Sequence, residues 1–347
     1  MKMMKTFLGA AAAVFALSGC MKNQDIELPD YVKQTTYFAS QFPIRTIVLG
    51  EDLFVDNSLD NQHKFSLKAT TGGVRENTKD IELDYNIDAS LCTNLYFSAD
   101  RGNGKVVPLP ASYYQLPSNK IIIPKGSILG GMDIQLTDAF FADPLAIGNT
   151  YALPVRLSAA KGADSILKGR PAIGVTIPNP LIDAHWAVKP KDFTVFALKF
   201  VNTWHGNYLR RGKDVITGSV NSTIVRHGLY VENDEINKLS TRALTVVDFP
   251  VVVKNAAGTN ISVPLLLTFD NSGNCTVSSN NSLITAAGTG KFVSKGDKNS
   301  WGGKDRDAMY LDYNINITAQ NIQVKTVDTL VMRDRAVAAE YYTPVVR

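Results

Sequence analysis

The chain is poor in the residues that form disulfides or bind metals. Its 347 residues include three cysteines and four histidines. Cys92 and Cys275 lie in different halves of the chain, so a disulfide between them would cross a domain boundary. We therefore expect both to be small buried apolar side chains. Neither Cys-x-x-Cys nor His-Glu-x-x-His occurs, so the sequence predicts no metal site and no cofactor.

Recognisable catalytic motifs are also lacking. No Gly-x-Ser-x-Gly occurs, and the Gly288–Lys291 stretch has Phe292 where a phosphate-binding loop needs Ser or Thr. We therefore expect a protein that is not an enzyme. The alternative is a glycoside hydrolase that uses two carboxylates from distant segments, since neighbouring acids such as Glu232 and Asp234 are usually only solvated.

Charge of one sign is not in large excess. The 36 basic and 32 acidic residues give +4, and removal of Lys2 and Lys5 with the first 19 residues leaves 36 − 2 − 32 = +2. Nucleic-acid binders usually carry a clustered basic face, so we expect no nucleic-acid partner. Beyond the N-terminus no apolar run approaches the roughly 20 residues of a membrane span.

The N-terminus carries an export signal. Two lysines precede an Ala-rich apolar run from Phe7 to Leu17, and small residues lead directly into Cys20. This pattern is typical of a signal that is cleaved before a lipidated cysteine. The sequence predicts a signal peptide at residues 1–19 and a polar tether at 20–31, with the membrane as a partner through lipidated Cys20.

Residues 32–178 show the period-two alternation of half-buried antiparallel strands. Turn residues separate the segments, and only Asp138–Ala142 indicates a helical turn. The alternating segments are Phe65–Ala69, Ile81–Ile87, Met132–Leu136 and Tyr151–Leu157. Short strands without a long helix between them predict a β-sandwich.

A proline-rich linker at residues 179–184 separates this domain from residues 185–347, because prolines remove strand hydrogen-bond donors. In the second domain Phe193–Val201 is apolar on both faces, whereas Met309–Thr318 alternates cleanly. Residues 255–258 and 270–273 resemble hairpin loops. About ten strands with short connections favour an antiparallel β-barrel, and a second sandwich is the alternative.

The second domain also contains a polar loop around Trp301. An exposed indole beside charged and amide groups suits a sugar, which presents a C–H face and hydroxyl groups. The alternative is that Trp301 folds back over its own domain and the charges are a solvated rim. The glycan-binding candidates in this loop are Asp297, Asn299, Trp301, Lys304, Asp305 and Arg306.

Trp204 and Tyr208 are weaker candidates. They lie in a Gly-containing corner near the start of the expected barrel, where a tryptophan usually closes one end. We expect a structural role for Trp204 there, with its indole N–H bonded to a backbone acceptor, and a ligand role is the alternative.

Two sets of segments resemble a known family. Leu109–Leu116, Ile122–Gly126 and Tyr151–Leu157 resemble the N-terminal module of Bacteroidota surface lipoproteins, a module also found before some endo-β-N-acetylglucosaminidases. Val201–Gly212 and Trp301–Asp307 resemble a companion C-terminal domain of unknown function. The resemblance covers essentially the whole chain after the signal peptide.

This resemblance implies an all-β fold, with an N-terminal immunoglobulin-like β-sandwich followed by a lipocalin-like antiparallel β-barrel. It also implies an outer-membrane lipoprotein at the cell surface, with a glycan ligand and a place in a glycan-import complex of a polysaccharide-utilisation system. The chain has no room for the hydrolase domain of the longer relatives, so their activity is not expected. A structural or adhesive surface subunit is a further alternative.

Overall fold

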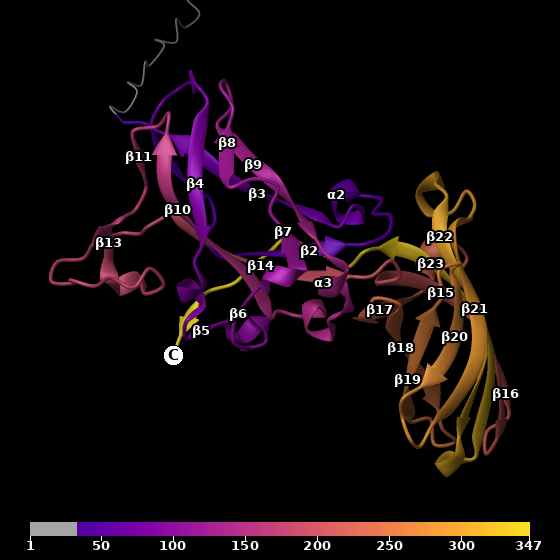
Figure 1. Cartoon of the computed structure of the whole chain (residues 1–347). Helices are drawn as coiled ribbons and strands as arrows, with labels where there is room; N and C mark the ends of the chain where they lie inside the picture. Colours follow the sequence, from indigo (N-terminus) through magenta and orange to yellow (C-terminus); the bar gives the residue numbers. More distant parts are fainter. Residues whose placement is uncertain (1–32) are drawn as a thin grey trace, which may run out of the picture.

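The structure is a computed structural model and describes residues 33–347, so the predicted signal peptide, Cys20 and the tether lie outside the described residues. It is nearly all β, with 52% strand and 11% helix. An N-terminal sandwich is joined to a C-terminal barrel, and the two lie at opposite ends of the molecule (Figure 1). The predicted fold class is confirmed.

The first sheet of the sandwich has five strands. Its alternating residues behave as predicted, since Phe65 and Leu67 are buried while their neighbours are more exposed. In spatial order the strands are β11 (Ser165–Ile166), β1 (Thr35–Tyr37), β3 (Lys64–Gly72), β9 (Leu129–Leu136) and β7 (Tyr114–Gln115).

The second sheet has seven strands and packs against the first. Leu153 and Val155 face Phe65 and Leu67 in one apolar core. In spatial order the strands are β24 (Glu340–Tyr341), β2 (Pro43–Val48), β14 (Phe193–Val201), β10 (Tyr151–Lys161), β4 (Ile81–Ile87) and β8 (Lys120–Ile123), with β6 (Val107–Pro108) beside β10.

A second apolar cluster covers the other face of the seven-stranded sheet. Phe193 and Val195 of β14 pack there with Leu95, Phe97 and Tyr342. The central strand β14 is therefore buried on both faces, which explains why its sequence is apolar throughout. Nearby, β5 (Leu95–Tyr96) pairs with β25 (Val345–Val346).

The sandwich takes in segments that the sequence assigns to the barrel domain. β14 lies between β10 and β2, and β24 adds to the edge of β2. The chain leaves the sandwich after β14, builds the barrel and returns through its last residues. The proline-rich residues 179–184 belong to an excursion from the sandwich, which contains β12 (Arg170–Pro171) and β13 (Trp186–Val188). The expected boundaries therefore differ from the observed ones because strand pairing depends on distant partners.

The barrel is closed and antiparallel. Eight strands form the ring, because β15 pairs both with β17 and with β23, and β16 extends the sheet beside the far half of β15. The strands are β15 (Gly206–Gly218), β16 (Ser222–Arg226), β17 (Glu235–Ala243), β18 (Val246–Lys254), β19 (Asn260–Phe269), β20 (Asn274–Ser279), β21 (Thr285–Asp297), β22 (Arg306–Ile317) and β23 (Ile322–Asp334).

Alternation decides which side chains fill the barrel. On β22, Leu311, Tyr313 and Ile315 point inward and are buried, whereas Asp312 and Asn314 point outward. The predicted hairpin loops at 255–258 and 270–273 join β18 to β19 and β19 to β20. Side chains therefore fill the interior as a packed core.

Helices are short throughout the described part. α3 (Asp138–Ala142) lies where the sequence indicates a helical turn, and α2 is Ser58–Asn61. Across residues 33–347, no helix is both long and apolar enough to cross a membrane. The 3-10 helices are Ala89–Cys92, Ala99–Arg101, Ala111–Tyr113, Pro144–Ile147, Asp183–His185, Val231–Asn233, Trp301–Gly303 and Thr318–Gln320.

Arg335 joins the two domains. Its guanidinium donates to the carbonyl oxygens of Leu49 at 2.8 Å and Glu51 at 3.2 Å in the sandwich, and of Asn202 at 2.6 Å at the start of the barrel. Gly50 has φ +86°, and a Cβ there would lie 2.8 Å from Thr203 Cγ2. The close approach of the domains at this point therefore requires glycine.

Candidate functional site

The loop between β21 and β22 forms one wall of a groove on the barrel. Asp305 accepts hydrogen bonds from Lys298 Nζ at 2.9 Å and from the Asn299 amide at 3.0 Å. Asn299, Gly302 and Gly303 have positive φ, which turns the chain tightly. The Lys298 and Asn299 hydrogen bonds lower the pKa of Asp305. Asp305 therefore holds the loop together.

Trp301 lies at the base of this loop. Its indole Nε1 donates to the Met332 carbonyl at 3.2 Å, and the guanidinium carbon of Arg306 lies 3.5 Å from the ring centroid. Phe54 of the sandwich stacks at a centroid distance of 6.4 Å. Arg306 is buried and donates to the Trp301 carbonyl oxygen. The half-buried indole is therefore held by both domains.

The opposite wall is the segment after β16. Asp234 is buried and accepts from Arg211 Nε at 2.6 Å and from the Gly228 amide at 2.7 Å. These hydrogen bonds fix the turn that presents Leu229 and Tyr230. The exposed fractions of these two side chains are 83% and 60%.

The two walls enclose a groove of about 570 Å³. An exposed tyrosine ring stands beside carboxylate, amide and ammonium groups, which combines one flat apolar surface with several hydrogen-bonding groups. The lining residues are Arg211, Leu229, Tyr230, Val231, Glu232, Asp297, Lys298, Asn299, Ser300, Trp301, Gly302 and Gly303.

The structure divides the six candidates of this loop. Trp301, Asp297 and Asn299 line the groove, whereas Asp305 and Arg306 are engaged within the loop. Lys304 is exposed and does not line the groove.

Sequence reasoning missed Tyr230 and named no binding role for Glu232, which is exposed and lines the groove. An aromatic residue two positions after Gly228 in a polar turn was the available signal.

The two weaker candidates belong to the barrel core. Trp204 stacks on Phe269 with ring centroids 3.9 Å apart, and Tyr208 is fully buried. Tyr208 donates its hydroxyl to the Trp204 carbonyl at 3.0 Å. The prediction that the Trp204 indole N–H donates to a backbone acceptor is wrong, because Nε1 is buried without a partner among the described residues.

A charged network lies inside the barrel. Asp328 accepts from Arg210 Nε at 2.9 Å, from Arg226 at 2.6 Å and from the Tyr313 hydroxyl at 2.8 Å. Arg226 also pairs with Asp214. Burial and the Asp328 charge raise the pKa of Tyr313. Two guanidinium groups and two carboxylates pair with one another in this network, while the Nε of Arg226 is buried without a partner among the described residues.

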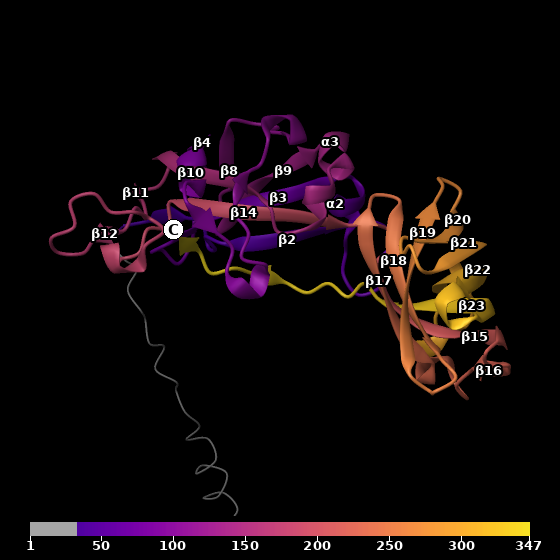
Figure 2. The ribbon, with the colours of Figure 1, turned by 90° about the horizontal axis from the view of Figure 1, so that it is seen from below.

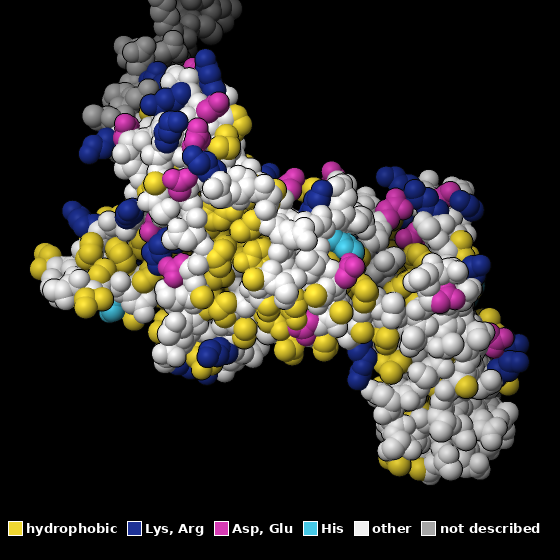
Figure 3. Space-filling view, in the orientation of Figure 1, with side chains coloured by type: hydrophobic (Ala, Val, Ile, Leu, Met, Phe, Trp, Pro, Cys, Tyr) yellow, Lys and Arg dark blue, Asp and Glu magenta, His cyan; other side chains and the backbone are white. Residues whose placement is uncertain are grey.

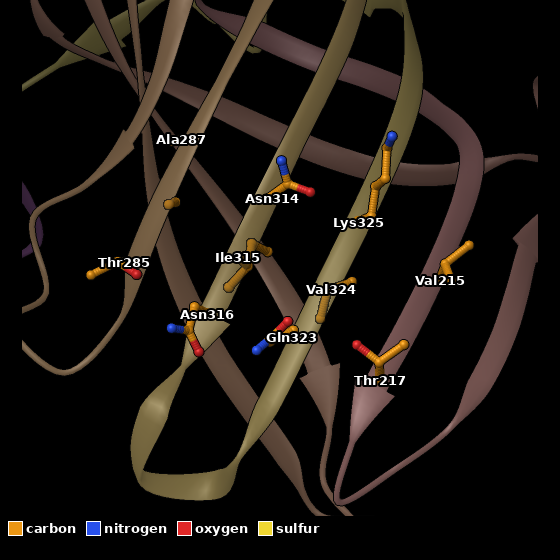
Figure 4. Close-up of a pocket in the computed structure, with 11 residues that line it drawn as sticks. Val215, Thr217, Thr285, Ala287, Asn314, Ile315, Asn316, Gln323, Val324 and Lys325 are labelled. Carbon is orange, nitrogen blue, oxygen red and sulfur yellow. The ribbon is translucent and has the colours of Figure 1, made fainter.

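A second groove, of about 440 Å³, lies on the outer barrel face (Figure 4). Cross-strand register brings Thr285 beside Asn316, Asn316 beside Gln323, and Gln323 beside Thr217. These side chains offer hydrogen bonds across four strands, but no aromatic ring lines the groove. The groove between Tyr230 and the Trp301 loop is therefore the better candidate for a sugar-binding site.

Within residues 33–347, no group of three or more His, Cys, Asp or Glu side chains is arranged to hold a metal ion. Cys92 and Cys275 are free and buried. Burial raises the pKa of each thiol to about 12.

Comparison with known proteins identifies the family. A family model for an N-terminal domain matches residues 31–164, and one for a domain of unknown function (DUF5627) matches residues 203–336. A crystal structure of a Bacteroides ovatus protein of unknown function is 46% identical, with a TM-score of 0.86 over 92% of this chain and 100% of that chain. The chain belongs to the family of this protein. The suspected two-module architecture is confirmed.

Two further solved structures are only weakly similar. An auxiliary nutrient binding protein from Bacteroides thetaiotaomicron is 14% identical, covering 86% of this chain and 95% of its own, with a TM-score of 0.37. A Bacteroides ovatus protein named for carbohydrate binding is 13% identical, covering 88% and 99%, with a TM-score of 0.27. Similarity this low says nothing about the ligand of this chain. No curated protein matches the chain.

Proposed function

We propose that this protein is a lipid-anchored envelope protein that binds glycan, without hydrolysing it, in the groove between Tyr230 and the Trp301 loop. The observation that carries the proposal is the exposed Tyr230 ring beside a groove with carboxylate and amide groups. A sugar ring needs both elements, because its C–H face packs on an aromatic ring while its hydroxyls form hydrogen bonds.

The position of each polar group supports this role. Glu232 lies two residues after Tyr230, and Asp297 and Asn299 come from the opposite wall. Asp234 and Asp305 accept backbone hydrogen bonds within the two walls, so the groove is formed before a ligand arrives. A groove that is already formed loses less conformational entropy on binding.

The sequence supports the anchor. Cys20 follows a short apolar run and small residues, which is typical of a lipidated first residue. Two or more acyl chains hold a protein firmly on a membrane. We propose that the protein lies on the outer membrane, facing the cell exterior, where it supplies glycan to an import complex.

The test compares two tyrosines of equal exposure. Tyr230→Ala removes the ring beside the groove, and Tyr341→Ala removes a ring on the sandwich that is 61% exposed. Affinity electrophoresis against a polysaccharide panel should show retardation of the wild type and of Tyr341→Ala. Tyr230→Ala should bind roughly 30-fold more weakly, as expected for an aromatic hot spot worth about 2 kcal/mol. Absence of binding to every polysaccharide would refute the proposal.

A hydrolase is the second candidate, because Glu232 and Asp297 line the same groove. A glycoside hydrolase needs a protonated carboxylic acid, which usually lies in an apolar pocket. Glu232 is exposed and Asp297 is half-exposed, so neither has such surroundings. We expect no release of reducing sugar from a bound glycan, and release abolished by Glu232→Gln would establish the hydrolase instead.

A further inference from the structure

Residues 167–191 form a projection from the sandwich. It leaves after β11, contains the β12–β13 pair and returns to β14. Two perpendicular views place this projection at the end of the molecule opposite the barrel (Figures 1 and 2). It belongs to neither of the two main sheets of the sandwich.

Hydrogen bonds give the projection a defined shape. The Trp186 indole donates to the Asn179 carbonyl at 2.8 Å, and the Asn179 amide donates to His185 Nδ1 at 2.9 Å. Leu181 is buried in the apolar cluster beneath, and the Lys191 amide donates to the Leu167 carbonyl at 2.8 Å. The tip is therefore held by its own base.

The tip is apolar and uncovered. Of the large apolar side chains in residues 33–347, Ile173 and Ile177 are the two most exposed, at 105% and 87%. The space-filling view shows apolar side chains gathered at this end of the molecule (Figure 3). An exposed apolar tip on an ordered support is typical of a contact surface.

The N-terminal end of the described chain lies beside the base of the projection. Thr35 pairs with Ser165, and the Leu167 amide donates to the Thr36 carbonyl at 3.0 Å, so β1 lies against the base of the projection. Lys33 follows Cys20 by 13 positions (33 − 20 = 13). A chain of that length spans at most about 45 Å, so a lipid on Cys20 keeps this end of the sandwich near the bilayer.

The charge of the projection suits the same surface. Residues 167–191 contain four basic side chains and one acidic side chain, Asp183, which pairs with Lys189. Segments that lie in a membrane interface combine apolar side chains with lysine and arginine, which attract anionic headgroups. The basic residues are Lys168, Arg170, Lys189 and Lys191.

We infer that the projection is a membrane contact, which inserts Ile173 and Ile177 among the lipid headgroups of the bilayer that holds the Cys20 anchor. This inference rests on the anchor in the proposed function and does not depend on glycan binding. With a lipid at one point and the projection at a second, the sandwich is fixed in orientation. The barrel and its groove then point away from the bilayer.

The test uses a fluorophore that reports on its surroundings. Ile173→Cys can be labelled selectively, because Cys92 and Cys275 are buried and unreactive. The full chain with lipidated Cys20 is labelled at position 173 and placed in phosphatidylethanolamine–phosphatidylglycerol vesicles. We expect blue-shifted emission and quenching by nitroxide lipids.

The control is the same label at position 283, because Leu283 is 69% exposed at the end of the barrel. That label should stay in water, and adding Ile177→Asp should reduce the quenching at position 173. If the protein floats with the vesicles but the label at 173 stays as exposed to water as the label at 283, the anchor stands and the membrane contact of the projection is refuted. Protein that does not float would overturn the anchor and the projection together. A blue shift that depends on protein concentration without vesicles would show a second copy as the occupant and overturn the membrane contact.

Discussion

The guanidinium of Arg306 lies against the indole of Trp301, with its central carbon 3.5 Å from the ring centroid. Nε and one terminal nitrogen of Arg306 both donate to the Trp301 carbonyl oxygen at 3.2 Å. The ring stacking and the hydrogen bonds fix the loop to the start of β22. Trp301 therefore holds one wall of the groove in place, and Tyr230 on the other wall presents its ring to solvent.

Trp301→Ala should lower the free energy of unfolding by about 2 kcal/mol, which is part of the cost of removing a fully buried aromatic ring. The substitution would remove the half-buried indole and its contacts with Arg306 and Phe54. Urea unfolding measures the change. Lys304→Ala in the same loop is the control and should stay within about 0.5 kcal/mol. Equal stability of the two variants would contradict a supporting role for Trp301.

Asp328→Asn should be more damaging, by about 3–5 kcal/mol, because it leaves buried guanidinium groups without their counter-charge. Asp328 is 1% exposed and contacts Arg210, Arg226 and Tyr313. Urea unfolding again gives the value. Asp305→Asn, which changes an exposed carboxylate to the same amide, should have a much smaller effect, because ion pairs on the surface contribute little to stability.

Stability should fall as the pH drops from 6.5 towards 4, in part because of His205. Burial, together with the charge of Arg335, lowers the pKa of His205 from 6.5 to about 4. Its Nδ1 accepts a hydrogen bond from the Thr241 amide at 3.0 Å. Above pH 6.5 the side chain is neutral in both states. Between 6.5 and 4 only the unfolded chain takes up the proton, which favours unfolding by up to about 3 kcal/mol.

His205→Asn keeps a hydrogen-bond acceptor but cannot take up a proton in this range. The variant should lose less stability than the wild type between pH 6.5 and 4, as measured by urea unfolding at a series of pH values. Parallel curves for the two proteins would show that His205 does not contribute.

Arg335→Ala should loosen the contact between sandwich and barrel. Three carbonyl oxygens, on Leu49, Glu51 and Asn202, would lose their donor at once. Small-angle X-ray scattering should report a larger radius of gyration. Arg333→Ala, two residues away, removes a partly exposed arginine paired with Asp334 and should leave the radius unchanged.

Local patterns predicted much of the fold. Alternation located β3, β4, β9, β10 and β22, because a period of two follows from the pleat of a single strand. The domain boundaries depend on pairing between distant strands. The sequence predicts that the apolar run Phe193–Val201 belongs to the barrel domain, although burial on both faces is also what the centre of a covered sheet requires.

The candidate site was predicted in part for a similar reason. The polar composition of the loop pointed to Asp297, Asn299 and Trp301, which do line the groove. Whether the face of the Trp301 ring is accessible to a ligand depends on Arg306 and Phe54, which pack against it. Phe54 is almost 250 residues away in the sequence. Tyr230 enters the groove through the fold of β15 and β16, and no local spacing connects it with residues 297–303.

The most direct test of the central claim is a hydrogen-exchange footprint of the full chain with a polysaccharide from the binding panel. Binding in the groove between Tyr230 and the Trp301 loop should slow exchange at residues 229–232 and 297–303 when the glycan is present and leave exchange in the sandwich unchanged. Protection confined to the sandwich or to the amide-lined groove at Asn316 and Gln323 would contradict it.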